Sequence, residues 1–320
     1  MIKNLLKILT YHHYTYKVVL KGTALFIYNG YYNEKYGNKV IIMNTDIKLV
    51  ALDLDRTTLN SESHLSEVNR QALIDAISNG VHVCIASGRA FDTLPEDIIS
   101  VSGIEYAITS NGAAIYRITG KECLKSYLLT PSSVKTILNL TANDTVTYEA
   151  FIKGQAFAST EYTAHPEKYS ATEHSLNYVK KTRILKDDIV SFILEHCHEL
   201  DSLDIVVGDE ELKKNIMDRI RKATDEVYMT SSISQLLEIS YKDAGKKSGV
   251  KFLTEYLGLS RENVAAFGDA DNDTDMIEYA GVGIAMENAA PHLKQIADHV
   301  TLHHDKDGVA YAFRNILNIC

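Results

Sequence analysis

Acidic side chains occur in two groups whose spacing suits metal and phosphate chemistry. In this 320-residue chain, Asp53 and Asp55 directly follow the apolar run 47–52, and in an extended conformation their side chains would emerge on the same side. A second group, Gly-Asp-Ala-Asp-Asn-Asp at 268–273, follows the apolar run 264–267 and adds four oxygen-bearing side chains. Hard oxygen ligands without His or Cys suit Mg²⁺, which binds through one or two carboxylates together with a substrate phosphate. Because such acids repel one another without a cation, we expect a Mg²⁺ site rather than a set of solvent-exposed helix caps.

The segments around these acids alternate between strand-like and helix-like patterns. A helix capped by Ser66 and ended by Gly80, and a helix of about ten residues from Phe91, are predicted between β-prone runs. These runs lie at 47–52, 81–86, 106–109, 264–267 and 281–285. Strands alternating with helices predict an α/β fold with a Rossmann-like, doubly wound parallel sheet. Such sheets bind ligands at the carboxyl ends of their strands, where the acids lie.

The middle of the chain has a different pattern. Residues 128–235 combine short strands, turns at Gly154 and Gly208, and helices predicted at 187–200 and 209–223. We therefore expect an α+β unit inserted into the first domain, whose two parts are 47–127 and 236–320.

Overall charge and cysteine content limit the classes of binding partner that the protein is expected to have. Forty-two acidic and thirty-three basic residues give a net charge of −9, which disfavours binding to nucleic acid or to anionic membranes. The four cysteines form no CxxC pair, so neither a zinc site nor a disulfide framework is expected. These features favour a cytoplasmic protein with a small-molecule partner, and they leave the oligomeric state open.

Residues 1–46 form a basic, Tyr-rich N-terminal extension. Residues 1–42 contain six lysines, seven tyrosines and a single acid, Glu34. Their apolar stretch at 18–27 is too short and too interrupted to span a bilayer, and the segment lacks the Arg and Ser of a transit peptide. We interpret it as an accessory or miscalled leader with Met43 as a possible start, and a membrane-associating segment is the alternative.

The motifs resemble those of the haloacid dehalogenase-like hydrolase superfamily, in particular its Cof-type phosphatases with the large type IIB cap. The resemblance runs from about residue 47 to the C-terminus. Residues 53–57 resemble the DxDxT motif and residues 268–273 the GDxxND motif, while Ser87 and Lys246 match the second and third motifs. Lys247 is the alternative to Lys246.

The resemblance implies a role for each of these residues. Asp53 would be the nucleophile that forms an aspartyl phosphate, and Asp55 would be the general acid and base. Ser87 and Lys246 would hold the phosphoryl oxygens. The implied Mg²⁺ ligands are the carboxylates of Asp53, Asp269 and Asp273 and the backbone carbonyl of Asp55, and the residues implied to position phosphate or substrate are Arg89, Asn111 and Asn272.

The expected activity is a Mg²⁺-dependent phosphomonoester phosphatase acting on a small phosphorylated metabolite, such as a sugar phosphate or a cofactor phosphate. A phosphomutase using the same aspartate pair and a non-catalytic phosphate-binding regulator are the alternatives. Arg56 stands where the family most often has Gly, and it would either crowd the loop or add a cation beside the phosphate. The paired histidines, among them His303 and His304, lack the spacing of a zinc site.

Overall fold

The computed structural model describes residues 7–11, 14–21, 24–30 and 46–320, and the chain divides into two compact units, Met1–Asp46 and Ile47–Cys320. In the first unit, an antiparallel three-stranded sheet has the order β1-β2-β3, with β1 at Lys7–Tyr11, β2 at Tyr14–Lys21 and β3 at Ala24–Gly30. The sequence did not predict these strands. Met43 lies outside the described residues, so its role as a start stays a prediction.

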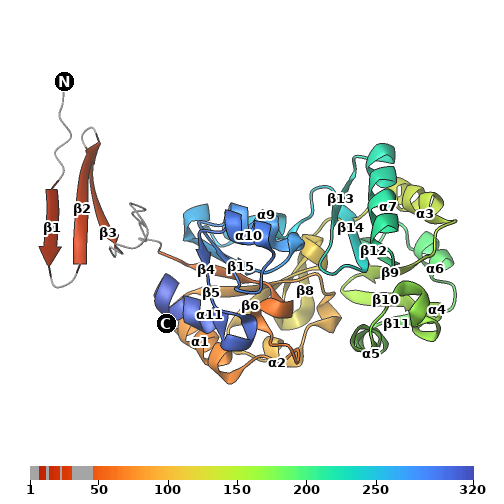
Figure 1. The fold of residues 1–320 in the computed structure, drawn as a ribbon, viewed down its shortest axis with the longest axis horizontal. Helices are drawn as coiled ribbons and strands as arrows, with labels where there is room; N and C mark the ends of the chain where they lie inside the picture. The colour runs from red at the N-terminus through yellow and green to blue at the C-terminus, as the bar shows by residue number, and fades with distance from the viewer. Residues whose placement is uncertain (1–6, 12–13, 22–23, 31–45) are drawn as a thin grey trace. The chain divides into compact units, whose positions relative to one another are not determined.

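The second unit contains an eight-stranded sheet, which we call the core sheet (Figure 1). Its order is β17-β16-β15-β4-β5-β6-β7-β8, and its pairings are parallel except those of β7 with β6 and with β8, which are antiparallel. The strands are β4 (Leu49–Leu52), β5 (His82–Ala86), β6 (Ile104–Thr109), β7 (Ala114–Arg117), β8 (Glu122–Ser126), β15 (Val264–Gly268), β16 (Val282–Ala285) and β17 (His299–Val300). The central strands are buried along their whole length, as expected for a sheet covered on both faces.

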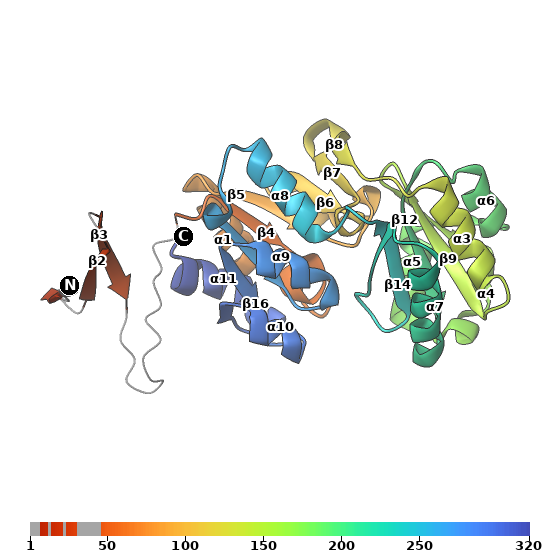
Figure 2. The ribbon, with the colours of Figure 1, turned by 90° about the horizontal axis from the view of Figure 1, so that it is seen from above.

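Helices cover the two faces of the core sheet (Figures 1 and 2). On one face, α1 (Glu67–Ser78) and α11 (Gly308–Ala312) contribute Leu73 and Val309 to one apolar cluster. On the other, α8 (Lys246–Tyr256) and α9 (Thr274–Tyr279) contribute Val250 and Met276 to a second cluster. The doubly wound α/β fold predicted from the sequence is therefore confirmed.

Two predicted helices have informative boundaries. Helix α1 begins as expected, because Ser66 Oγ accepts a hydrogen bond from the backbone N–H of Asn69 at 3.1 Å. The prediction of a helix of about ten residues from Phe91 is wrong, since the chain forms only a short 3-10 turn at Phe91–Thr93 and then α2 at Glu96–Ile99. Pro95 explains the break, because its ring disfavours a helical conformation at the preceding residue and removes a backbone donor.

The inserted unit, which we call the cap, has its own six-stranded sheet. The order is β11-β10-β9-β12-β14-β13, formed by β9 (Val146–Ile152), β10 (Gln155–Ser159), β11 (Ile184–Lys186), β12 (Leu200–Val207), β13 (Val227–Thr230) and β14 (Leu236–Tyr241). Its helices are α3 (Pro131–Thr141), α4 (Thr160–Ala164), α5 (Glu173–Thr182), α6 (Ile189–Glu195) and α7 (Glu210–Ala223). Because β14 pairs with β12, residues 236–241 belong to the cap sheet, and the expected core boundary at 236 is too early.

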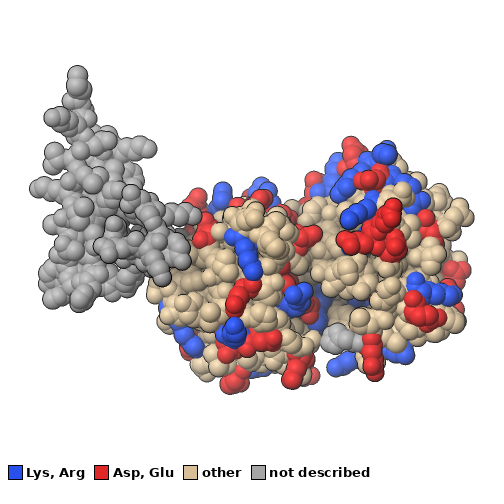
Figure 3. Space-filling view, viewed as in Figure 1, with Lys and Arg blue, Asp and Glu red and all other residues tan. Residues whose placement is uncertain are grey.

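The remaining core helix is α10 at Pro291–Ile296. Within the described part of the chain, no helix has the length and hydropathy needed to cross a bilayer. On the face of the molecule in Figure 3, side chains of both signs occur over both the core and the cap.

Candidate active site

The order in which the chain adds strands to the core sheet reverses between β4 and β15. From β4 the chain adds β5 and β6 on one side, whereas β15, β16 and β17 extend the sheet on the other. The register pairs Leu52 with Phe267, and the backbone N–H of Asp53 donates to the Phe267 carbonyl at 3.1 Å. The two acidic groups of the sequence therefore leave adjacent strands at the point where an open α/β sheet forms its binding crevice.

Three carboxylates meet at this point. Oxygens of Asp53, Asp269 and Asp273 all lie within 4.8 Å of one another, and the three residues are 6%, 5% and 0% exposed. Burial, followed by the charge of Asp273, raises the pKa of Asp53 well above its ordinary value and that of Asp269 to about 7. A buried set of hard oxygens that resist ionisation together fits a divalent cation such as Mg²⁺, which would relieve this repulsion.

Lys246 is the buried cation of this cluster. Its Nζ donates to Asp53 Oδ1 at 2.7 Å and to Asp273 Oδ1 at 2.6 Å, and the residue is fully buried. Burial alone would lower the pKa of Lys246, but the charges of Asp273 and Asp53 outweigh it and raise the pKa. Lys247 instead donates its backbone N–H to Asp275, so the structure brings Lys246 rather than its neighbour into the cluster.

Close backbone packing places Lys246 beside the loop after β6. Gly245 has φ +121° and Gly112 has φ +90°, and a Cβ on Gly112 would lie 1.9 Å from the Gly245 carbonyl oxygen. Only glycine fits both the backbone conformation and this approach. The contact brings the loop that contains Asn111 against the start of α8.

Asp55 occupies a different environment from Asp53. The strand ends at Leu52. Asp53 and Asp55 keep extended backbone angles, and the chain turns after Asp55, where Arg56 adopts a left-handed conformation with φ 62° and ψ 15°. Asp55 is not among the three clustered carboxylates, and its side chain is 51% exposed. Both of its oxygens accept from Arg89, at 2.8 Å from Nε and 2.6 Å from Nη2.

The other expected phosphate-binding residues form a hydrogen-bonded chain. Ser87 Oγ accepts from the backbone N–H of Arg89 at 3.2 Å, and the Ser87 carbonyl accepts from that of Asn111 at 3.1 Å. Asn272 Nδ2 donates to Asn111 Oδ1 at 3.0 Å. The structure thus brings Ser87, Asn111 and Asn272 together, whereas the guanidinium of Arg89 lies on Asp55.

Two residues at the site were missed by sequence reasoning. Asn288 Nδ2 donates to the Arg56 carbonyl at 2.8 Å and to Asp269 Oδ2 at 3.4 Å. Glu238, on cap strand β14, accepts from Asn111 Nδ2 at 2.9 Å. Asn288 follows β16 by three residues, so the rule that found the acids at strand ends could have found it, whereas nothing in the sequence pointed to Glu238.

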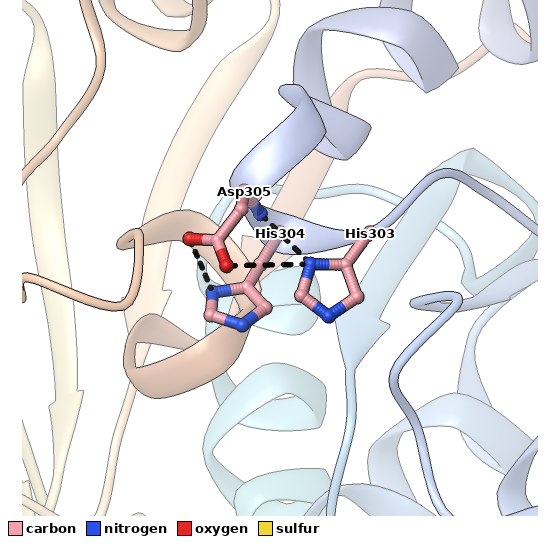
Figure 4. A group of neighbouring side chains, drawn as sticks. All are labelled: His303, His304 and Asp305. Carbon is pink, nitrogen blue, oxygen red and sulfur yellow. Dashed lines mark hydrogen bonds and ion pairs between the residues drawn. The ribbon is translucent and has the colours of Figure 1, made fainter.

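A second cluster of possible metal ligands contains His303, His304 and Asp305 (Figure 4). Asp305 donates its backbone N–H to His303 Nδ1 at 3.2 Å, and His304 Nδ1 donates to the Leu59 carbonyl at 3.0 Å. The Asp305 carboxylate accepts from the backbone N–H of Ser61 at 2.8 Å and from its hydroxyl at 2.6 Å. The atoms of this cluster that face one another already have hydrogen-bond partners within the protein. These hydrogen bonds hold residues 59–61 against residues 303–305.

Known proteins resemble this chain in sequence and fold. A family model described as haloacid dehalogenase-like hydrolase matches residues 50–313. Phosphatase YwpJ of Bacillus subtilis is 31% identical over 290 residues, which cover 85% of this chain and 100% of the relative. The 5-amino-6-(5-phospho-D-ribitylamino)uracil phosphatase YcsE of the same organism is 28% identical over 274 residues, 85% of this chain and 96% of the relative. A solved haloacid dehalogenase-like hydrolase from B. subtilis has a TM-score of 0.72 and 27% identity, covering 85% of this chain and 100% of its own.

The family match includes both strands that carry the clustered acids and the cap between them. It agrees with the resemblance drawn from the motifs, and the relatives that span the same region include phosphatases. The chain therefore belongs to the haloacid dehalogenase-like hydrolases, among which it is a Cof-type phosphatase that hydrolyses phosphoric monoesters.

Proposed function

We propose that this phosphatase depends on Mg²⁺ and hydrolyses small phosphorylated metabolites through an aspartyl phosphate on Asp53. The observation that supports it best is the position of the Asp53 carboxylate, buried beside Asp269 and Asp273 and hydrogen-bonded to Lys246. Mg²⁺, when bound by these carboxylates, supplies the positive charge that lets an anionic nucleophile approach a phosphate ester. The buried oxygen ligands fit this ion.

In the first step, a carboxylate oxygen of Asp53 attacks phosphorus, and the bond between phosphorus and the ester oxygen breaks. Asp55 transfers a proton to the departing oxygen, so the alcohol leaves neutral. Asp55 then accepts a proton from water as that water attacks phosphorus, the bond from phosphorus to the Asp53 oxygen breaks, and inorganic phosphate is released. Each step moves one proton through Asp55, and the second step restores both carboxyl groups.

Lys246 orients the nucleophile during these steps. It holds Asp53 Oδ1 at 2.7 Å, and its charge remains in place because Asp273 anchors the same ammonium. Together with the Ser87 hydroxyl, it would stabilise the negative charge on the transferred phosphoryl oxygens.

Substrate candidates are sugar phosphates and cofactor phosphates. The relative YcsE is named for a phosphorylated ribitylaminouracil, which combines a polyol chain with a ring. The cysteines Cys84, Cys123, Cys197 and Cys320 are free thiols, which agrees with the proposed cytoplasmic location.

A hydrolysis screen tests the proposal. Purified protein is incubated with a panel of phosphorylated metabolites, with Mg²⁺ or with EDTA, and released inorganic phosphate is measured. We expect phosphate release from several esters with Mg²⁺ and none with EDTA, and no release by the Asp53→Asn variant. An isomerised sugar phosphate without free phosphate would instead indicate a phosphomutase, and activity that survives exhaustive chelation would refute the Mg²⁺ mechanism.

A further inference from the structure

A cavity of about 360 Å³ opens between the core and the cap beside Asp269. Its core wall includes Arg56, Asp269, Asp271 and Asn288, and its cap wall includes Glu210, Lys213, Ser231, Ser232 and Ser234. The volume is in the range of small-ligand sites. Because the cavity adjoins a carboxylate of the proposed Mg²⁺ site, it is positioned to receive the part of a substrate that lies beyond the phosphate.

Lys213 is a buried cation in the wall of this cavity. The residue is 7% exposed, and its Nζ donates to Ser231 Oγ at 3.2 Å and to the Ser234 carbonyl at 2.7 Å. No carboxylate of the described residues lies within ion-pair distance of this ammonium. A buried charge without a counter-ion is costly, because hydroxyl and carbonyl partners compensate only part of its lost hydration.

The acids in the same walls have their own partners. Glu210 lies 3.7 Å from Lys214, and Asp271 lies 3.2 Å from His292. Asp269 belongs to the carboxylate cluster, where a bound Mg²⁺ would neutralise it. Burial lowers the pKa of Lys213 and outweighs the charges of Glu210, Asp271 and Glu238, which favour its ammonium form. The cavity therefore offsets the charge of Lys213 only in part.

Arg56 supplies a second cation on the opposite wall. Its Nε is 3.7 Å from Asp269 Oδ2, and its side chain is 63% exposed. Its backbone is left-handed, with φ 62° and ψ 15°, a conformation that favours glycine.

We propose that Lys213, with Arg56 across the cavity, binds a second anionic group of the substrate, such as a carboxylate or another phosphate. This inference rests on the proposed phosphatase function and specifies the leaving group. A charge-assisted hydrogen bond to Lys213 would favour an anionic leaving group over a neutral one by about tenfold or more.

Two esters with the same carbon chain test this inference. In 6-phosphogluconate the end remote from the phosphate is a carboxylate, and in glucitol 6-phosphate it is a hydroxymethyl group. Each is measured as a competitor of p-nitrophenyl phosphate hydrolysis, so inhibition constants are obtained whether or not the competitor is turned over. We expect wild-type protein to bind 6-phosphogluconate about tenfold or more tightly, and Lys213→Gln to remove most of this preference.

Lys222→Gln is the matched control, because Lys222 lies on the same helix, α7, is exposed and does not line the cavity. It should leave the ratio of inhibition constants unchanged. If Lys213→Gln weakened both esters by the same factor, Lys213 would only support the loop at 231–234 and the inference would be wrong. Equal binding of the two esters by wild type would also overturn it. Neither result would affect the phosphatase assignment, which the hydrolysis of p-nitrophenyl phosphate tests separately.

Discussion

Arg89 holds Asp55 through both carboxylate oxygens, with Nε 2.8 Å from Oδ2 and Nη2 2.6 Å from Oδ1. Its guanidinium also lies over the ring of Tyr178 on cap helix α5, 4.8 Å from the centroid. Arg183 of the cap lies 4.9 Å from the same ring and donates to Glu149 at 2.7 Å. The proposed general acid of the core is therefore linked to the cap through a single arginine.

Removing this link should impair proton transfer more than phosphoryl transfer. In Arg89→Gln, Asp55 loses its bidentate partner and its orientation, so kcat for alkyl phosphates should fall by about tenfold to a hundredfold. The loss should be smaller for p-nitrophenyl phosphate, whose leaving group needs no proton. Tyr178→Phe keeps the ring under the guanidinium and should behave nearly as wild type. An equal loss with both kinds of ester would show that Arg89 acts elsewhere, for example on the phosphate.

Replacing Asp53, the proposed nucleophile, should separate activity from stability. Asp53→Asn should reduce phosphate release by more than about a thousandfold, because an amide is a far weaker nucleophile. Burial and Asp273 raise the pKa of Asp53, so its ionised form destabilises the metal-free fold at neutral pH, and the neutral amide should not lower the Tm measured in EDTA.

Lys246→Met provides the contrast to this variant. It leaves the buried carboxylates of Asp53 and Asp273 without their cation and should destabilise the fold by about 3–5 kcal/mol. A metal-free Asp53→Asn protein as unstable as Lys246→Met would mean that the ionised Asp53 stabilises the fold.

Much of this site could be predicted because polar residues at the ends of apolar strands are visible in the sequence. The order of the strands is not visible, and it is the pairing of Leu52 with Phe267 that brings Asp53 and Asp269 together. The motif resemblance supplied that adjacency. The contact between Asp55 and Arg89 was missed because strand alternation groups Asp55 with Asp53 and does not show which side chain of another strand end lies opposite it.

The boundary of the cap was misplaced for a related reason. Residues 236–241 have the composition of a strand, but composition does not say which sheet the strand joins. Hydrogen bonds to β12 place it in the cap, where Glu238 reaches Asn111 of the core. Tertiary pairing of this kind also explains why Glu238 was not identified as a neighbour of the site.

Metal removal gives a direct test of the carboxylate cluster. EDTA should abolish phosphate release and Mg²⁺ should restore it, whereas Ca²⁺ should restore little because its larger coordination shell misplaces the attacking carboxylate. Asp269→Ala should weaken Mg²⁺ binding measured by calorimetry and lower activity at subsaturating Mg²⁺. Unchanged Mg²⁺ affinity in this variant would exclude Asp269 as a ligand.

The stability of the fold should depend on pH through Asp201, which lies near the start of cap strand β12. It is 3% exposed and accepts from Ser126 Oγ at 3.1 Å, and burial raises its pKa to about 6. The folded state therefore binds this proton more tightly than the unfolded state does, so the free energy of unfolding should fall as the pH rises from about 4 to about 6. Asp201→Asn keeps an oxygen acceptor for Ser126 but carries no charge.

We therefore expect Asp201→Asn to stabilise the protein by on the order of 2 kcal/mol above pH 6 and to have little effect near pH 4. Urea unfolding at pH 4, 5, 6 and 8 measures this difference, in EDTA so that metal binding does not contribute. Asp187→Asn, at an exposed position of the cap, is the control and should change the curve little at any pH. A stabilisation of the same size at every pH would mean that the amide acts through packing or hydrogen bonding. Only an ionisable carboxyl with a raised pKa produces a stability difference that is small at pH 4 and appears as the pH rises to 6.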